Sequence, residues 1–284
     1  MKIVSSVEEI QSICSKKKKD GVRIGFVPTM GFLHKGHLSL VKRAKELTDF
    51  TVVSIFVNPT QFSPNEDLNK YPRDIDNDKR LLENENVDLV FIPEASEIYP
   101  ENFQTYTEVS KITRQLEGEF RPTHFKGVTT IVNILFNIIQ PDVAFFGQKD
   151  AQQSAVIKRM VTDLKLPIQI EVCPIVRESD GLAMSSRNVY LSESERLDAL
   201  VLSRSLTFGT NLINSGERDS QKIIDGMTTL VNLVSTSKLE YIKIVNEKSF
   251  ELAEVLIKGQ SYFLLIACWI GKTRLIDNTI ISVS

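Results

Sequence analysis

The first 176 residues alternate between short, continuous apolar runs and longer stretches in which apolar residues recur at helical spacing. The short runs are typical of buried strands, and the longer stretches are typical of helices with one apolar face. We expect strands at 22–27, 51–57, 88–92, 143–146 and 168–172, and helices at 36–48, 73–86, 128–140 and 151–164. Strands that alternate with helices form a parallel sheet covered on both faces. The pattern therefore predicts an α/β domain with a Rossmann-like, doubly wound parallel sheet.

The pattern changes after residues 177–181. Two helical patterns, at about 193–214 and 219–235, are followed by strand-like segments at 241–245, 261–269 and 273–282. No helical pattern separates these three segments, which favours an antiparallel meander, and Gly271–Thr273 is expected to be a hairpin turn. We therefore divide the chain into a Rossmann-like domain at 1–176 and a smaller C-terminal α+β domain at 177–284, which is in the usual size range for a domain.

Composition and charge exclude several classes of function. A formal net charge of −2 does not give the basic surface of a nucleic-acid-binding protein. Cys14, Cys173 and Cys268 lack the spacing of a disulfide framework or a zinc site. The longest apolar run, 262–270, is too short to cross a bilayer, and the first residues show no signal-peptide pattern. We expect a cytoplasmic protein with no nucleic-acid partner and no membrane partner.

Two of the three histidines lie three residues apart, where a predicted strand gives way to a predicted helix. His34 and His37 form an H-x-G-H element with Gly36, which has no side chain to keep a ligand away from the backbone. The first turn of the helix offers N–H groups and the positive end of a dipole. Helix capping or core packing would also account for histidines at this position. Their place at the junction favours a site for the phosphates of a nucleotide.

Polar segments follow two further predicted strands, and ligands of doubly wound sheets bind beyond the carboxyl ends of the strands. We expect 58–62 and 147–150 to converge with 28–37 on one crevice. Gln61 can donate and accept hydrogen bonds to a small polar substrate, although its segment could also be a plain turn. Lys149 is expected to reach phosphate and Asp150 to cap the following helix, on which Gln153 lies one turn further along.

A fourth polar segment, residues 177–188, joins the two predicted domains. Its stretch Met184–Arg187 holds two hydroxyl groups and a guanidinium, and these suit the β- and γ-phosphates of ATP. A segment in this place can close over a nucleotide, and a polar linker is the alternative. His124 precedes an apolar helix and is expected to be a structural hydrogen-bonding residue, with a place in a substrate site as the alternative.

Taken together, these segments resemble the pantothenate synthetase family, the pantoate–β-alanine ligases; the matching stretches are PTMGFLHKGH, FVNPTQF, YPR at 71–73, EGEFRPTHFKGV, FFGQKDAQQ and RESDGLAMSSRNVYL. The resemblance covers nearly the whole chain and is strongest from Gly25 to Leu191. It implies that ATP and (R)-pantoate form pantoyl adenylate and pyrophosphate. β-Alanine then attacks the adenylate to give pantothenate and AMP, a reaction of coenzyme A biosynthesis. The resemblance also implies a Rossmann-like fold and a homodimer.

The resemblance further assigns roles to residues of this chain. ATP would be bound by Met30, Gly31, Phe32, Leu33, His34, Lys35, Gly36, His37, Gly147, Gln148, Lys149, Asp150, Val176, Met184, Ser185, Ser186 and Arg187. Pantoate would be held by Gln61 and Gln153, and Gln61 would also border the β-alanine site. The catalytic groups would be His34, His37, Lys149 and Arg187, as positive groups around the phosphates, with His37 as proton donor. The backbone of Val176 would meet adenine.

Magnesium is expected to accompany ATP on its phosphates, because Asn77 occupies a position at which some family members offer a second acid. Three other interpretations remain open. An aminoacyl-tRNA synthetase shares an H-x-G-H element, but this chain has neither an anticodon domain nor a basic surface. Another adenylyltransferase of the H-x-G-H class would consume ATP without needing β-alanine. A nucleotide-sensing module would bind ATP and release no pyrophosphate.

Overall fold

The protein, described by a computed structural model for residues 1–62, 68 and 70–284, contains two compact units. The N-terminal unit comprises Met1–Gln148 and Gln152–Pro174, and the C-terminal unit comprises Lys149–Ala151 and Ile175–Ser284. Each unit has its own sheet and its own hydrophobic core. The N-terminal unit thus ends at Pro174 rather than at 176, and the three residues Lys149–Ala151 belong to the C-terminal unit although the residues on either side of them do not.

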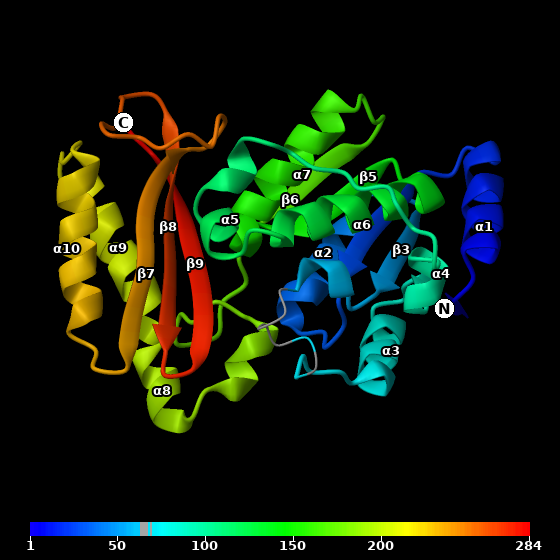
Figure 1. Ribbon diagram of the computed structural model, residues 1–284, viewed down its shortest axis with the longest axis horizontal. Coiled ribbons are helices and arrows are strands. Elements are labelled where there is room, and N and C mark those ends of the chain that lie inside the picture. The colour runs from blue at the N-terminus through cyan, green and yellow to red at the C-terminus, as the bar shows by residue number, and fades with distance from the viewer. Residues whose placement is uncertain (63–67, 69) are drawn as a thin grey trace. The chain divides into compact units, whose positions relative to one another are not determined.

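The sheet of the N-terminal unit has six parallel strands in the order β1-β4-β3-β2-β5-β6 (Figure 1). These strands are β1 (Lys2–Val4), β2 (Ile24–Thr29), β3 (Phe50–Ile55), β4 (Leu89–Phe91), β5 (Val143–Gly147) and β6 (Gln169–Cys173). After β2, the chain adds β3 and β4 on one side and then crosses to add β5 and β6 on the other. The order reverses between β2 and β5, which is the point beyond which such sheets bind ligands. The predicted Rossmann-like fold is confirmed, and only the short, mostly exposed β1 gave no signal in the pattern.

Helices cover both faces of this sheet. Phe26 on β2 packs with residues of α1 (Val7–Lys19), α6 (His124–Ile139) and α7 (Ala151–Asp163). The next residue, Val27, packs with residues of α2 (Lys35–Leu47) and α3 (Ile75–Asn84) on the opposite face, as the alternation of side chains along a strand requires. The remaining short turns are η1 (Pro59–Gln61), α4 (Ala95–Ile98), η2 (Ile112–Arg114), α5 (Glu117–Phe120) and η3 (Gln148–Asp150).

The C-terminal unit is an α+β arrangement. Its strands β7 (Ser237–Asn246), β8 (Ser261–Ile270) and β9 (Thr273–Ser282) form the predicted antiparallel meander, and Ile270 pairs with Thr273 across the predicted hairpin turn. The helices α9 (Leu200–Asn214) and α10 (Ser220–Asn232) pack together and against the sheet (Figure 1). The helix expected at 193–214 is divided at Ala199 into α8 (Glu193–Asp198) and α9, and the Ala199 N–H bonds the carbonyls of both Glu195 and Leu197 there. The 3₁₀ turn η4 (Ser186–Tyr190) precedes them.

Within the described part of the chain, no helix combines the length and the apolar character that crossing a bilayer demands.

Candidate active site

The two clustered histidines cap the helix that follows β2. His34 is the N-cap of α2, and its Nδ1 accepts a hydrogen bond from the Gly36 N–H at 3.1 Å. Nδ1 of His37 accepts from the His34 N–H at 3.3 Å, so the two side chains form a reciprocal capping box. Their ring centroids are 4.1 Å apart. Capping, which we considered as an alternative to phosphate binding, thus occurs at the same place as the candidate phosphate site.

The capping bonds determine which ring nitrogen holds the proton. A nitrogen that accepts a backbone N–H cannot hold a hydrogen of its own, so the neutral rings of His34 and His37 have their proton on Nε2. A doubly protonated imidazolium would lose the cap. These side chains are therefore suited to act as Nε2–H donors, whereas the sequence suggested that they supply positive charge.

A buried carboxylate from α3 shapes the loop that leads to His34. The two oxygens of Asp78 accept hydrogen bonds from the N–H groups of Phe32 at 2.8 Å and Leu33 at 2.7 Å. Phe32 has φ of +50° and Gly31 has φ of +80°, and a Cβ on Gly31 would lie 3.0 Å from Asp78 Oδ2. Burial raises the pKa of Asp78, and the two N–H donors oppose that shift. This role of Asp78 was not apparent from the sequence, in which the acidic run at the start of α3 was considered only for magnesium, and magnesium was expected on the ATP phosphates instead.

Gln61 lies beside the histidine loop. It is buried at the end of η1, and its Nε2 lies 3.0 Å from Sδ of Met30. The segments 28–37 and 58–62, two of the three that were expected to converge, therefore meet here. β5 ends at Gly147 beside β2 in the sheet, so Gly147 lies at the same sheet edge as this contact. Lys149, from the third segment, belongs to the C-terminal unit.

A chain of hydrogen bonds fixes the orientation of the Gln61 amide. Nδ2 of buried Asn58 donates to the Gly127 carbonyl at 3.2 Å and to Oε1 of Gln61 at 3.1 Å. Because the carbonyl can only accept, Asn58 must direct its NH₂ group there, and its Oδ1 accepts from the Tyr99 hydroxyl at 2.8 Å. Burial raises the pKa of Tyr99 and keeps its donor proton in place. The roles of Asn58 and Tyr99 were not predicted. The only signal for Asn58 was its place three positions before Gln61, and the sequence held no signal for Tyr99.

His124 supports the same segment, in agreement with the structural role that we expected. Its Nδ1 donates to the Gln61 carbonyl at 3.0 Å. The helix α6 begins at His124 rather than at 128 because Lys126 and Gly127 interrupt the apolar spacing on which the prediction relied. Gly127 lets α6 approach η1 closely, since a Cβ there would lie 2.4 Å from the Thr60 carbonyl oxygen.

The remaining predicted residues after β5 lie on η3 and α7. Lys149 Nζ is 3.8 Å from Oδ1 of Asp150, so the ammonium is paired within its own turn. Gln153 is half-buried on α7. Its neighbour Gln152 is buried and has a structural role, because it bonds the main chain at Ile112, Gln115 and Glu117.

The segment predicted to bind the triphosphate forms a hairpin in the C-terminal unit. The Met184 N–H donates to the Val176 carbonyl at 3.0 Å, and the Glu178 N–H donates to the Leu182 carbonyl at 2.8 Å. These bonds bring Val176, the predicted adenine contact, next to the start of Met184–Arg187. Ser185 caps η4 by accepting from the Arg187 N–H at 3.2 Å.

Comparison with known proteins identifies the family. The model of the pantoate-beta-alanine ligase family matches residues 2–280. The chain belongs to this family. It is 52% identical over 281 residues to pantothenate synthetase of Pseudothermotoga lettingae, with 99% of each chain covered. It is 52% identical over 283 residues to pantothenate synthetase of Caldicellulosiruptor saccharolyticus, with 100% of each chain covered.

Solved structures agree with this family assignment. Pantothenate synthetase from Thermus thermophilus superposes with a TM-score of 0.92 at 41% identity, covering 98% of this chain and 99% of that one. A pantoate-beta-alanine ligase from Francisella tularensis, complexed with Beta-gamma ATP and Beta-alanine, superposes with a TM-score of 0.79 at 34% identity, covering 99% of this chain and 97% of that one. The observed six-stranded parallel sheet with a small antiparallel C-terminal sheet is thus the fold of this ligase family.

The carboxylates of the described residues are poorly arranged for a resident metal ion. The described residues contain no group of three or more His, Cys, Asp or Glu side chains that could hold one. In the acidic run of α3, Asp74 accepts from the Asn77 N–H at 3.1 Å, Asp76 lies 3.7 Å from the ammonium of Lys79, and Asp78 is occupied by the loop. These side chains do not fit a protein-held magnesium ion.

Proposed function

We propose that this enzyme condenses (R)-pantoate with β-alanine to pantothenate, using ATP and releasing AMP and pyrophosphate. One observation in the structure supports this most directly. Two imidazoles, each with its proton on Nε2, lie at the N-terminus of α2, and the loop before them contacts the buried amide of Gln61 through Met30. Donors for phosphate oxygens and a neutral amide for a small polar acid are thus neighbours. Membership of the ligase family supplies the reaction.

The reaction takes place in two steps. An oxygen of the pantoate carboxylate forms a bond to the α-phosphorus of ATP while the bond to the β,γ-diphosphate breaks, which gives pantoyl adenylate and pyrophosphate. The β-alanine amine then attacks the acyl carbon, AMP leaves and the amine loses a proton. The first step needs no general base, because the carboxylate is already ionised at neutral pH. Its main obstacle is the approach of one anion to another, which nearby donors and cations lower.

We assign the ATP-binding role to Met30–His37, Gly147–Asp150, Val176 and Met184–Arg187, with His34, His37, Lys149 and Arg187 as the catalytic groups. His34 and His37 would donate Nε2–H bonds to phosphate oxygens, and the proton-donor role of His37 would be this hydrogen bond. Lys149 and Arg187 would supply the positive charge. Each charge-assisted contact would contribute on the order of 1.5–3 kcal/mol. Magnesium would enter with ATP on the phosphates, where it prefers to keep several waters.

We assign pantoate binding to Gln61 and Gln153, with Gln61 also bordering β-alanine. Oε1 of Gln61 is occupied by Asn58, so Gln61 would offer an Nε2–H donor to an oxygen of the substrate. A neutral amide would orient the carboxylate without neutralising it. A lysine there would pair with the carboxylate and weaken its attack. Holding pantoate in line with the α-phosphorus lowers the barrier further through proximity.

We further infer a cytoplasmic homodimer from the family resemblance. The three cysteines are buried and free, as suits a reducing compartment. Sedimentation of the purified protein at several concentrations tests the oligomeric state.

A product assay tests the function. The enzyme is incubated with ATP, magnesium and pantoate, with and without β-alanine, and pyrophosphate, AMP and pantothenate are measured. We expect a stoichiometric burst of pyrophosphate without β-alanine, and continuous AMP and pantothenate formation with it. Steady pyrophosphate release together with a dinucleotide product, independent of β-alanine, would instead identify another adenylyltransferase. ATP binding without any pyrophosphate would identify a nucleotide-sensing module.

A further inference from the structure

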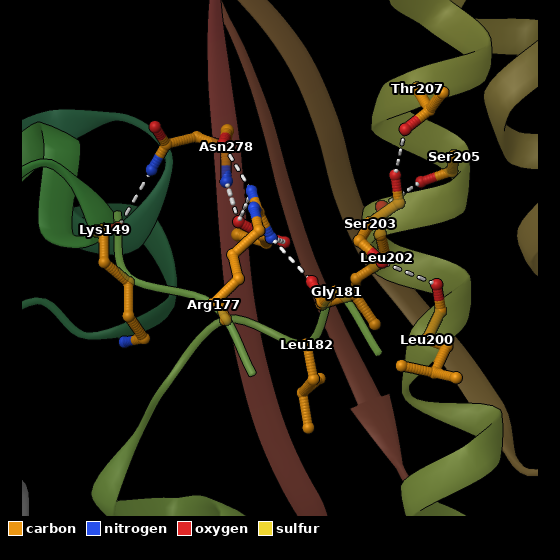
Figure 2. Close-up of polar contacts among 12 residues, drawn as sticks. Lys149, Arg177, Gly181, Leu182, Leu200, Leu202, Ser203, Ser205, Thr207 and Asn278 are labelled. Carbon is orange, nitrogen blue, oxygen red and sulfur yellow. Dashed lines mark hydrogen bonds and ion pairs between the residues drawn. The ribbon is translucent and has the colours of Figure 1, made fainter. Parts of the chain in front are cut away.

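Two neighbouring buried residues of β9 contact distant parts of the C-terminal unit. Asp277 and Asn278 are 3% and 1% exposed. Nδ2 of Asn278 donates a hydrogen bond to the main-chain carbonyl of Lys149 at 3.0 Å, across 129 positions of sequence (Figure 2). A buried amide that bonds a main-chain carbonyl fixes the course of the backbone at that carbonyl.

Asp277 binds the start of the hairpin that contains Val176. Its Oδ2 and Oδ1 accept from Nη1 and Nη2 of Arg177 at 2.7 and 3.0 Å, a two-point contact with fixed geometry. Arg177 also donates to the carbonyl of Asn278 at 3.3 Å, and Oδ1 of Asp277 accepts from the Asn278 N–H at 2.7 Å. Arg177, Asp277, Asn278 and the Lys149 carbonyl therefore form one connected network, the β9 network.

We propose that Asn278 is a positioning residue for Lys149, and that it acts on adenylate formation by fixing the backbone from which the Lys149 side chain extends. This inference rests on the proposed role of Lys149 toward the ATP phosphates. Asn278 does not touch the substrate in this scheme. It acts through Lys149 alone, and the Arg177–Asp277 pair keeps Asn278 in place.

The direction of the Lys149 side chain supports this role. In Figure 2 the carbonyl of Lys149 faces Asn278, while the side chain extends away from that contact. A lysine side chain is long and flexible, so its ammonium reaches a defined point only if the backbone beneath it is fixed. Misplacement of a catalytic group by about 1 Å can cost on the order of 100-fold in rate. A single buried hydrogen bond at residue 149 is therefore enough to affect the chemistry.

Asn278→Asp is the informative substitution. The shape of the side chain is kept, but a carboxylate oxygen replaces the NH₂ group and faces the Lys149 carbonyl, so two acceptors oppose each other. We expect a roughly 10- to 100-fold lower rate of pyrophosphate release from ATP and pantoate. The reaction of preformed pantoyl adenylate with β-alanine, which has no β- or γ-phosphate, is expected to change much less.

A double-mutant cycle separates positioning from general destabilisation. Single-turnover pyrophosphate release is measured for the wild type, Asn278→Asp, Lys149→Ala and the double variant. We expect Asn278→Asp to slow the step when Lys149 is present and to have no further effect in the Lys149→Ala background. An equal slowing in both backgrounds would show that Asn278 does not act through Lys149 and would overturn the inference.

Two further variants keep the test decisive. Ile223→Val removes a methyl group from the core of the same unit, and it controls for lost stability because Ile223 lies outside the β9 network. It is expected to lower the melting temperature and to leave pyrophosphate release unchanged. If Asn278→Asp does not fold, Asn278→Ala, which removes the donor without adding charge, takes its place in the cycle. A wild type that releases no pyrophosphate with pantoate would refute the proposed function, whereas an active wild type with additive effects would refute only the role of Asn278.

Discussion

The carboxylate of Asp78 and the main-chain N–H of Leu33 are joined by a buried hydrogen bond of 2.7 Å, 45 positions apart in sequence. The second oxygen of the same carboxylate holds the neighbouring N–H of Phe32. One acid on α3 therefore determines the path of the backbone that enters the capping box of His34 and His37.

Asp78→Asn is expected to disturb this loop although the side chain keeps its size. An amide can accept one of the two N–H groups, but its NH₂ group must then face the other. We expect a loss of about 1–3 kcal/mol in the free energy of unfolding, together with slower pyrophosphate release. Urea unfolding and single-turnover kinetics measure the two effects. Asp76→Asn is the matched control, since the Asp76 side chain is 93% exposed, and equal behaviour of both variants would contradict the role of Asp78.

His34→Asn is expected to separate capping from catalysis. Asparagine is among the best N-cap residues, so the bond from the Gly36 N–H is retained and stability changes little. The Nε2–H donor is lost, and we expect the rate of adenylate formation to fall by roughly 100- to 1,000-fold. His34→Ala loses both the cap and the Nε2–H donor, so its free energy of unfolding should also fall by about 0.5–2 kcal/mol. Thermal unfolding and pyrophosphate release distinguish the variants, and a fully active His34→Asn would remove His34 from the chemistry.

His37→Ala is expected to lower the turnover of adenylate formation far more than it lowers stability. Its cap to the His34 N–H contributes on the order of 1 kcal/mol, whereas its proposed Nε2–H hydrogen bond acts on the reacting phosphate groups. Turnover in saturating ATP and pantoate is compared with the melting temperature. Near-normal turnover would show that the assigned role is wrong.

Gln61→Glu is expected to raise the KM for pantoate steeply while the KM for ATP changes little. The carboxylate can still accept from Asn58, but it offers an oxygen where the amide offered an N–H, and so it repels an anionic substrate. Gln61→Ala removes the donor without adding repulsion and should have a smaller effect in the same direction. If both variants weaken ATP and pantoate equally, Gln61 does not belong specifically to the pantoate site.

The buried thiols are expected to make stability fall at alkaline pH. Burial raises the pKa of Cys14 to about 12 and the pKa values of Cys173 and Cys268 to about 11. As the pH rises, the thiols ionise in the unfolded chain at a lower pH than in the folded protein. Their contribution to the free energy of unfolding is therefore fully present below pH of about 8.5. It is lost as the pH rises toward the pKa values of the folded protein, by roughly 1.4 kcal/mol per pH unit for each thiol. Unfolding free energies from pH 8 to 10 test this. Cys14→Ala should show a shallower decline than the wild type, and parallel curves would contradict the expectation.

Local patterns in the sequence are sufficient to predict most of the fold. The strands β2 to β6 of the parallel sheet, the meander and the turn at Gly271 follow from the spacing of apolar residues and from one hairpin signal. The placement of the H-x-G-H element at the start of α2 was likewise predictable, because a strand that turns into a helix is a local event. The strand β1 was missed because two of its three residues are exposed, so it lacks the buried apolar run of the equally short β4.

The sequence alone thus determined the family, the order of the elements and the residues expected to meet the substrates. Only the tertiary structure decided which side chains hold those residues by hydrogen bonds. Asp78 accepts from the N–H groups of Phe32 and Leu33. Asn58, itself bound by Tyr99, holds Gln61, and Asn278 holds the carbonyl of Lys149. The tertiary structure also decided that His34 and His37 have their proton on Nε2. Most of these pairings join residues tens of positions apart. Propensity and periodicity act over a few residues, whereas the partner of a buried polar group is chosen by the packing of whole helices and strands.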